Sequence, residues 1–380
     1  MHKEQRLRTI DSLQAEGIAA ALFAHPETVT WLTGFAPSIQ LGQHHFAGGP
    51  SLVWYGDGHF YLIVLDGHVA EAHAFDDEPD GTVLGYEGYS IDHPIRSHAA
   101  MRAVLDTLLG DTLPGKGTIG IEERHLTRMM AYSLHQHLTP AHTLTTLDGL
   151  LTEARMVKTA EELAKLRENF RLTDIGHAVA REVIAPGKRE IDVWTEIHSA
   201  INREAGARVP LGNDLVVSSR QPNNIGGWPL AHTIQAGDTV TVDLSTAYQG
   251  YWSDSCASYF ASGDPTPEQQ AALTVVGDAL DYAISLIRPG AIASEVDAKV
   301  RHFIEKAGYP VYPHHTGHGV GVSVHEEPRI VPYNHTILQA GMVVMLEPGI
   351  YIPGQLSIRH EDGLLITSDG VEILTRHKKY

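Results

Sequence analysis

The 380-residue sequence has very little of several features that define other classes of protein. It contains one cysteine, Cys256, so no disulfide can form within the chain, and a reducing compartment is expected. Aromatic residues make up 7% of the chain, and no apolar run approaches the roughly 20 residues that a membrane span needs. Residues 1–10 are polar and basic and lack the hydrophobic region of a secretion signal. We therefore expect a soluble, cytoplasmic protein.

Positive charge is also scarce. The chain has 28 lysines and arginines against 46 aspartates and glutamates, which gives a formal net charge of −18 at pH 7. This balance disfavours nucleic acid and anionic membranes as partners. The length exceeds the roughly 250 residues beyond which a single core stops growing, so two domains are expected.

The first 150 residues alternate between helical and strand-like patterns. The predicted helices cover residues 3–16, 96–109 and 124–137, and the predicted strands cover residues 18–23, 51–55, 59–65 and 118–121. This alternation predicts a small α/β domain over residues 1–150. A second domain over residues 151–380 begins with a long helix predicted at residues 160–183.

The second domain contains a sequence pattern that occurs twice. Ile184-Ala185-Pro186-Gly187 precedes a predicted helix that ends at Gly206, and Ile287-Arg288-Pro289-Gly290 precedes one that ends at Gly308. Each segment follows a helix and is followed by strand-like runs. Two halves related by a pseudo-two-fold axis would bring their strands into one curved sheet, with functional side chains in its concave face.

Five residues in the last 140 positions carry most of the functional information. They are four carboxylates and one imidazole, each in its own short segment: Asp243, Asp254, His318, Glu347 and Glu361. Such a set suits a pair of hard-to-borderline divalent metals and predicts a metallohydrolase. One softer nitrogen among oxygens favours manganese, cobalt, zinc or iron over calcium or magnesium.

The first two of these residues lie on a predicted hairpin. Asp243 follows the alternating run 239–242, and residues 247–250 form a plausible tight turn. A turn centred there sets Asp243 opposite Asp254, with Cβ atoms roughly 5 Å apart. Two facing carboxylates without a cation would repel each other, and a bound metal removes that conflict.

The other three residues also lie on or beside elements that hold them rigidly. Glu347 follows the apolar run 342–346, which predicts a buried strand, and Glu361 precedes a strand-like run at 364–367. His318 is flanked by glycines, which allow the backbone to approach a crowded site.

These segments resemble the signature of the Xaa-Pro peptidase/creatinase family. The matching segments are residues 243–254, 314–325, 346–351 and 359–362, and further motifs at residues 31–35 and 155–158 extend the resemblance over nearly the whole chain. The resemblance implies an α/β (α+β) protein with a small creatinase-like N-terminal domain and a pita-bread catalytic domain. It also implies two divalent metal ions, manganese first among them, a peptide or other small substrate, and a homodimer.

The resemblance also assigns roles to single residues. Glu347 would accept a proton from the attacking water, and His325 would contact the substrate and the tetrahedral intermediate. His314 and Tyr351 would line the same pocket, although for these two a packing role is equally open. Arg359 would support the metal site.

The sequence departs from the family pattern in three places. Seventeen positions before the first aspartate, where proline-directed members carry a pocket histidine, stands Gly226, within the changed stretch 220–232. Trp228 and His232 are candidate replacements for substrate binding. Residues 256–258 replace a common Thr-Arg-Thr stretch, and Ser245 stands where glycine is common.

Three functions therefore remain open. The first is a dinuclear-metal Xaa-Pro dipeptidase or aminopeptidase. The second is a hydrolase or lyase of a small non-peptide substrate, such as an ectoine-like cyclic amidine, on the same metal site. The third is a metal-free binding module, which the presence of all five ligand candidates disfavours. A zincin is excluded because Arg329 stands four residues after His325, where the second histidine would be, and no Gly-x-Ser-x-Gly elbow indicates a serine hydrolase.

Overall fold

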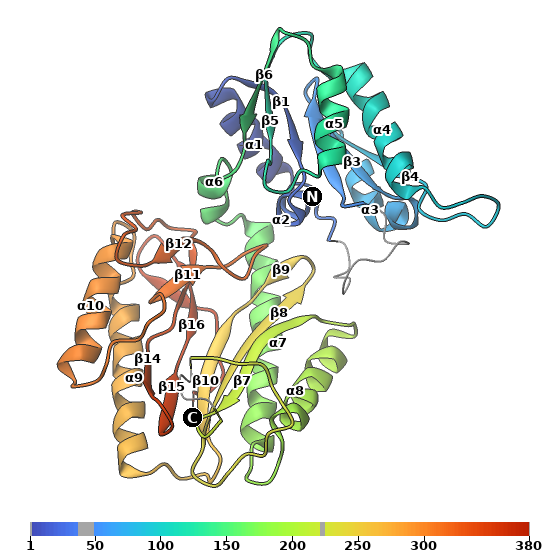
Figure 1. Cartoon of the computed structure of the whole chain (residues 1–380). Helices are drawn as coiled ribbons and strands as arrows, with labels where there is room; N and C mark the ends of the chain where they lie inside the picture. The colour runs from blue at the N-terminus through green and yellow to red at the C-terminus, as the bar shows by residue number, and fades with distance from the viewer. Residues whose placement is uncertain (1, 37–48, 221–224, 380) are drawn as a thin grey trace. The chain divides into compact units, whose positions relative to one another are not determined.

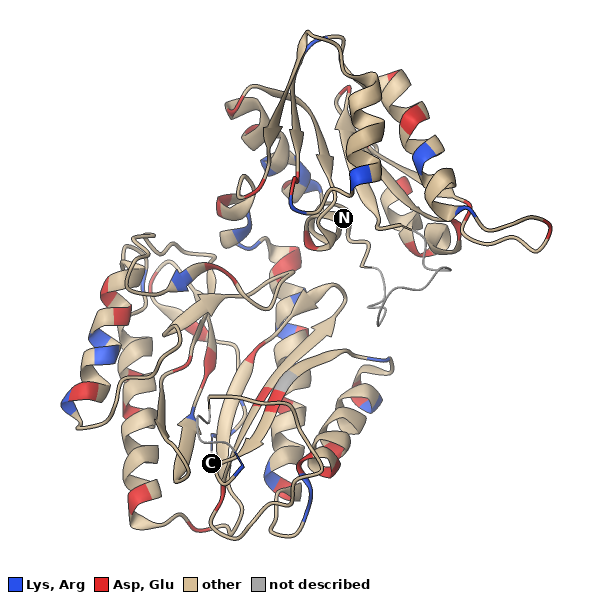
Figure 2. Cartoon of the chain, viewed as in Figure 1, with Lys and Arg blue, Asp and Glu red and all other residues tan. Residues whose placement is uncertain are grey.

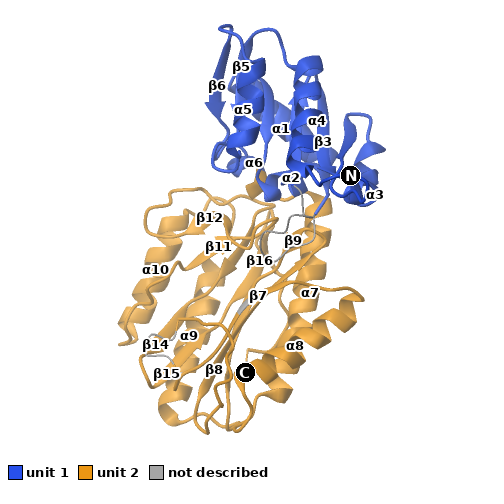
Figure 3. Cartoon of the chain, turned by 45° about the vertical axis from the view of Figure 1, so that its right-hand side comes forward, with its two compact units in different colours: residues 1–154 blue, residues 155–380 orange. Residues whose placement is uncertain are grey.

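The computed structural model describes residues 2–36, 49–220 and 225–379 (Figure 1). His44 and His45 of the first domain and residues 221–224 of the changed stretch lie outside these ranges. The chain divides into two compact units, residues 1–154 and 155–380 (Figure 3). None of the helices in the described ranges combines the length and apolarity that crossing a bilayer requires.

The first unit is built on a six-stranded sheet with the order β4-β3-β2-β1-β5-β6. Its strands are β1 (Ile18–Phe23), β2 (Leu52–Gly56), β3 (His59–Leu65), β4 (Gly81–Tyr86), β5 (Gly117–Ile121) and β6 (His142–Thr146). The helices of this part of the chain are α1 (Lys3–Ala15), α2 (Pro26–Thr33), η1 (Asp66–His68), α3 (Val69–Asp76), α4 (Ser97–Thr112), α5 (Arg128–His137) and α6 (Thr152–Met156). The elements predicted for this region are therefore confirmed, with boundaries that differ by a few residues.

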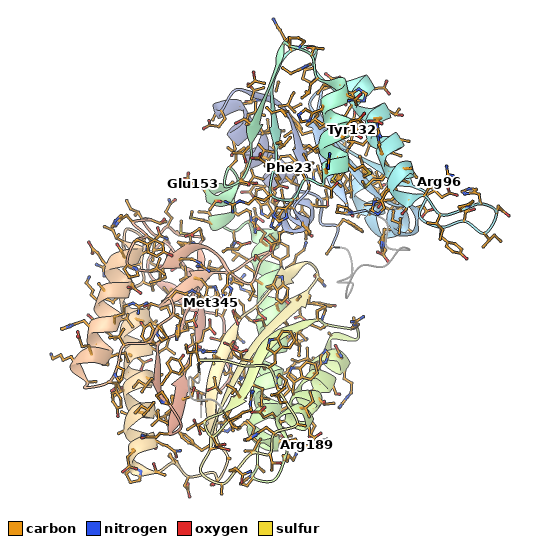
Figure 4. All side chains as sticks on the ribbon, in the orientation of Figure 1. Phe23, Arg96, Tyr132, Glu153, Arg189 and Met345 are labelled. Carbon is orange, nitrogen blue, oxygen red and sulfur yellow. The ribbon has the colours of Figure 1, made fainter. Side chains whose placement is uncertain are left out.

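The core of the first unit lies between the sheet and the helices α4 and α5. The central strand β1 is buried along nearly its whole length, and its last residue, Phe23, is fully buried. Met101 and Leu105 of α4 and Met130 of α5 pack in one cluster with Ala20 and Leu22 of β1. Figure 4 labels Phe23 within this unit. Apolar burial of this kind contributes most of the favourable free energy of folding.

The second unit consists of strands flanked by two pairs of helices. The helices are α7 (Ala160–Val183), α8 (Glu190–Ala205), α9 (Pro267–Leu286) and α10 (Ala293–Lys306). The strands are β7 (Leu211–Val217), β8 (Thr239–Tyr248), β9 (Tyr251–Trp252), β10 (Ser255–Phe260), β11 (Gly317–Gly319), β12 (Glu326–Ile330), β13 (Val343–Leu346), β14 (Gly349–Ile352), β15 (Leu356–Arg359), β16 (Asp362–Ile366) and β17 (Val371–Ile373). Helices α7 and α8 lie along β7 and β8, whereas α9 and α10 lie along β12 to β15 (Figure 1).

The sequence pattern that occurs twice forms a repeated structural unit. Each half has a long helix that begins at a threonine capping box, Thr159 for α7 and Thr266 for α9, and then a turn and a shorter helix. In each half a glycine N–H of the turn donates to a carbonyl oxygen of the segment after the shorter helix, at 2.9 Å: Gly187 to Ile234 and Gly290 to Leu338. The same sequence pattern thus produces the same hydrogen bonds twice.

The hairpin of β8, β9 and β10 forms as predicted, but its predicted register is wrong by two residues. Asp243 pairs with Cys256 and not with Asp254. The turn consists of Gln249 and Gly250, with φ angles of 53° and 78°, which is a two-residue turn of type I′. The prediction centred the turn one residue too early, and such a step moves every cross-strand partner by two positions.

Candidate metal centre

The five predicted ligands occupy five different places among the strands of the second unit. Asp243 lies in β8, Asp254 between β9 and β10, His318 at the centre of β11, Glu347 between β13 and β14, and Glu361 between β15 and β16. Figure 2 shows acidic residues among these strands as well as on the outer helices. Residues from both halves of the repeat therefore supply the group.

The side chain of His318 is the point toward which three carboxylates converge. Its Nε2 lies 3.6 Å from oxygens of Asp254, Glu347 and Glu361. Its other ring nitrogen, Nδ1, donates to the carbonyl oxygen of Gly319 at 2.9 Å, which leaves a lone pair on Nε2. Oxygens of Asp254 and Glu361 and a ring nitrogen of His318 lie within 4.8 Å of one another, and all three residues are buried.

Three atoms of this group are buried without a hydrogen bond of good geometry among the described residues: His318 Nε2, Glu347 Oε1 and Glu361 Oε1. Buried polar atoms in folded proteins nearly always have a partner, so each exception needs a physical reason. His318 Nε2 and Glu361 Oε1 face each other, and a cation bound between them would satisfy both acceptors. The donor set therefore fits a divalent metal.

Asp243 reaches the group although it is not directly opposite Asp254. The two residues are diagonal neighbours on one face of the hairpin, a spacing at which side chains still meet. Their carboxyl groups are close enough for the charge of Asp243 to raise the pKa of Asp254. Asp243 Oδ2 also accepts a hydrogen bond from the guanidinium of Arg359, at the end of β15. That arginine connects the ligand group to the adjoining two-stranded sheet.

The glycines that flank His318 are required by close backbone packing. A Cβ atom on Gly317 would lie 1.9 Å from the carbonyl oxygen of Met345, and one on Gly319 would lie 2.4 Å from that of Glu327. Met345, labelled in Figure 4, is the strand partner of His318 between β11 and β13. The expectation that these glycines let the backbone approach a crowded site is confirmed.

The carboxylates of the group repel one another. Burial raises the pKa of Glu361 well above its ordinary value, and the charges of Asp254 and Glu347 raise it further. Burial and the charge of Asp243 likewise raise the pKa of Asp254. Burial also lowers the pKa of His318 to about 3, so its ring is neutral at pH 7. The fold holds acidic groups together at a cost that bound cations would remove.

Glu347 differs from the other carboxylates because histidines surround it. Nε2 of His315 lies 2.6 Å from Glu347 Oε1, and Nδ1 of His314 lies 3.8 Å from Oε2. Burial acts to raise the pKa of Glu347, but the contact with His315 and the neighbouring imidazoles lower it to about 2. Glu347 is therefore an ionised carboxylate at neutral pH.

A cavity of about 270 Å³ opens beside the group. It is lined by Gly212, Asp214, Trp228, Asp243, Ser245, Trp252, Asp254, Val324 and His325. His325 is exposed, with its ring centroid 4.3 Å from that of His318. Trp228 is 81% exposed at the cavity wall, whereas His232, the other candidate replacement, is not among the lining residues.

His314 and Tyr351 meet beside the group and outside the lining of this cavity. Nε2 of His314 lies 2.7 Å from the hydroxyl oxygen of Tyr351, which in turn accepts from Arg359 at 3.1 Å. Burial lowers the pKa of His314 to about 4, so this ring is neutral at pH 7. These contacts hold the side chain of Arg359 against Asp243.

Sequence reasoning assigned no role to three residues that the fold brings to the site. His315 contacts Glu347, Ser245 donates to Asp254, and Asp214 of β7 pairs with Asp243 across the sheet. His315 lies within a segment that was already singled out, so its neighbours gave a signal. For Asp214 there was none, because its position depends on the register of β7 against β8.

Two family models match the chain. The model of metallopeptidase family M24 matches residues 164–368, and that of the creatinase/prolidase N-terminal domain matches residues 5–157. The chain belongs to metallopeptidase family M24. Membership of this family makes the protein a hydrolase and implies divalent metal ions. The creatinase-like first domain and the pita-bread catalytic domain expected from the sequence are confirmed.

Several members of family M24 are similar over long stretches. An Xaa-Pro dipeptidase of Lactobacillus delbrueckii subsp. lactis is 30% identical over 370 residues, which cover 97% of this chain and 95% of the relative. An Xaa-Pro dipeptidase of Pyrococcus furiosus is 34% identical over 234 residues, 61% of this chain and 67% of the relative. The crystal structure of the prolidase from Pyrococcus horikoshii OT3 matches with a TM-score of 0.83 and 25% identity, over 99% of each chain.

Proposed function

We propose that the protein is a dinuclear-metal Xaa-Pro dipeptidase or aminopeptidase. We expect two divalent ions, with manganese preferred, to be held by the five residues of the ligand group: Asp243, Asp254, His318, Glu347 and Glu361. The observation that carries the proposal is the pair of orphaned buried atoms, His318 Nε2 and Glu361 Oε1, among converging carboxylates. The relatives named above are Xaa-Pro dipeptidases and a prolidase, which disfavours the small non-peptide substrate.

Bound divalent ions would supply Lewis acidity for the amide carbonyl and would activate a water molecule. The protein's own groups do the rest. Glu347, ionised and at the edge of the ligand group, is placed to accept a proton from that water. His325 stands at the cavity wall, where its ring can donate a hydrogen bond to the substrate carbonyl oxygen.

Arg359 acts by position. Its guanidinium holds Asp243 Oδ2 while its backbone N–H donates to Ser258 Oγ at 3.0 Å. His314 and Tyr351 support it from the other side through the hydroxyl of Tyr351. Trp228 offers an apolar wall to a proline ring, whereas His232 of the same changed stretch lies outside the cavity lining.

Metal analysis followed by an activity screen tests the proposal. The manganese-loaded protein should hydrolyse Xaa-Pro dipeptides, with longer Xaa-Pro peptides and ring amides compared in parallel. Turnover of the dipeptides supports the proposal. Activity confined to a ring substrate would overturn it in favour of the non-peptide alternative.

Two variants test the site itself. Asp254→Asn and Glu347→Gln should each abolish activity while the thermal transition in chelator stays largely unchanged. Full activity in either variant would reject the ligand group. Asp192→Asn on the surface of α8 is the matched control.

Three wider proposals accompany this function. We propose a homodimer, which sedimentation velocity would test, and a cytoplasmic location, which cell fractionation would test. We also propose that a domain boundary near residue 150 separates two independently folded parts. Limited proteolysis should then cleave first near that position.

A further inference from the structure

Asp214 occupies the space that a side chain at position 226 would need. A Cβ atom built on Gly226 would lie 1.8 Å from Asp214 Oδ2 and 2.7 Å from its Cγ. The histidine that the family pattern led us to expect at this position would therefore fit only if the carboxyl group of Asp214 turned away. At this wall the cavity presents an anionic acceptor in place of an imidazole.

Asp214 faces the cavity and remains reachable. It pairs with Asp243 across β7 and β8, so both side chains project from the same face of the sheet. It lines the cavity together with Trp228 and His325. Its side chain retains 33% exposure, whereas that of Asp254 retains 7%. A substrate that enters the cavity meets this carboxylate beside the ligand group.

Asp214 forms no hydrogen bond with its neighbour Arg359. The Nη2 atom of Arg359 lies 3.9 Å from Asp214 Oδ2, beyond hydrogen-bond distance. The same guanidinium donates to Asp243 and to the Tyr351 hydroxyl oxygen. Two divalent ions would balance the other four carboxylates of the site, and Arg359 balances the charge of Asp214, but the carboxylate accepts no hydrogen bond from that guanidinium and can accept one from an ammonium group.

We propose that Asp214 binds an ammonium group of the substrate and so determines which amides the enzyme accepts. The proposal rests on the proposed function and deepens it. The ammonium group can come from the free N-terminus of a short peptide or from a basic first side chain. A charge-assisted hydrogen bond of this kind changes affinity roughly 10- to 100-fold.

Four substrates separate the two sources of the ammonium group. They are alanyl-proline, acetyl-alanyl-proline, lysyl-proline and norleucyl-proline, compared on the manganese-loaded wild type, Asp214→Asn, and the surface control Asp192→Asn. If the N-terminus binds Asp214, Asp214→Asn should raise KM roughly 10- to 100-fold for the three free dipeptides, with a smaller change in kcat. The acetylated substrate should be unaffected. If the lysine side chain binds it, the rise is confined to lysyl-proline.

A purely structural role gives different results. An equal change for all four substrates, including the acetylated one, would overturn the proposal, and so would loss of bound manganese in Asp214→Asn. The control Asp192→Asn should match the wild type throughout.

Failure of the proposed function is distinguishable from failure of this inference. If the wild type hydrolyses none of these substrates, the peptidase proposal fails, and calorimetry on the loaded protein then compares alanine amide with acetyl-alanine amide. Tighter binding of the free amine by the wild type but not by Asp214→Asn supports the ammonium site. Equal affinity for the two probes would overturn it.

A substitution at position 226 tests the placement of Asp214. Gly226→His should displace the carboxyl group of Asp214, because its Cβ would lie 1.8 Å from Oδ2, and should lose the preference for a free ammonium group. A preference for the free amine that persists in Gly226→His would contradict the proposal.

Discussion

Ser245 donates a hydrogen bond to Asp254 across the β8 hairpin, with its Oγ 2.9 Å from Oδ1 of the carboxylate. This bond fixes the orientation of a proposed metal ligand from a position where glycine is common in the family. Removing a partner of this kind weakens metal binding by roughly 10- to 100-fold in other sites. We expect Ser245→Ala to weaken manganese binding to a similar extent in a chelator competition titration. Unchanged affinity would show that Asp254 is held by other contacts, and Ser285→Ala on the surface of α9 is the matched control.

Removing the metal should lower the thermal stability of the protein, whereas replacing Glu361 should not lower the stability of the metal-free form. In chelator, Glu361→Gln should leave the thermal transition unchanged or raise it, because burial and Asp254 disfavour the charged carboxylate. In manganese, the wild type should gain about 2.7 kcal/mol at a free metal concentration of about 100 times Kd, and the variant should gain little. Differential scanning calorimetry with and without metal measures both. An equal gain in the two proteins would exclude Glu361 as a ligand.

A buried ion group holds the segment next to His325. Burial acts to raise the pKa of Glu326, but the charges of Arg155 and Lys158 lower it to about 2, and Lys158 Nζ lies 2.6 Å from Glu326 Oε2. Lys158→Met removes one partner of a buried charge, which costs about 3 to 5 kcal/mol in comparable cases. We expect a loss of that order in urea unfolding.

An exposed ion pair provides the control for that loss. Arg167 and Glu372 form an ion pair at 2.7 Å on the surface, with both side chains more than 40% exposed. Arg167→Ala should change stability by about 0 to 1 kcal/mol. Similar losses in Lys158→Met and Arg167→Ala would mean that burial does not strengthen the Glu326 group.

Acid should destabilise the protein from about pH 6.5 downward. Burial lowers the pKa of His177 well below its ordinary value, and the charges of His377 and Lys379 lower it further. This ring stays neutral in the fold, whereas the unfolded chain takes up the proton below about pH 6.5. The stabilising contribution is therefore fully present above that pH and falls by about 1.4 kcal/mol per pH unit below it.

Urea unfolding of the chelated protein at about pH 7, 6 and 5 measures this slope. His177→Gln preserves polar atoms near the hydroxyls of Tyr259 and Ser255, which lie 3.0 Å from the imidazole nitrogens. Its stability should fall less steeply with acid than that of the wild type. Parallel slopes in the two proteins would show that His177 does not carry the effect.

The hairpin turn can be improved. Gln249 adopts a φ of 53°, a conformation that asparagine tolerates better than glutamine, and Gly250 follows it with 78°. Gln249→Asn creates the Asn-Gly pair preferred in type I′ turns and should raise stability by about 0.4 to 1 kcal/mol. Gly250→Val should lower it. Thermal unfolding of both variants checks the turn type, and stabilisation by valine would contradict it.

The sequence predicted the elements of the site better than their register. The hydrophobic run before Glu347 and the alternating run before Asp243 indicated strands, because apolar periodicity is a local property of the chain. The turn residues Gln249 and Gly250 could be centred in more than one way, and the error moved the partner of Asp243 by two positions. The two residues that adopt the turn conformation determine the register of the hairpin, and the pattern of apolar residues does not identify them.

Contacts between distant segments were beyond sequence reasoning. The approach of Asp214 to Asp243 depends on how two strands align. The contact between Lys158 and Glu326 joins residues 168 positions apart. Family resemblance named Arg359 as a supporting residue, but only the fold shows that its partners are Asp243 and the Tyr351 hydroxyl. Such pairings follow from tertiary packing, which single-sequence patterns do not encode.

The distribution of the ligand group over five places in the chain has a consequence for biosynthesis. Asp243 emerges from the ribosome long before Glu361, and between them lie two helices and most of the second half of the repeat. A nascent chain cannot offer a complete coordination sphere until almost all of it has been made. Metal capture by the proposed ligand group is therefore a late event in maturation, and a bound divalent ion would mark chains that have folded to completion.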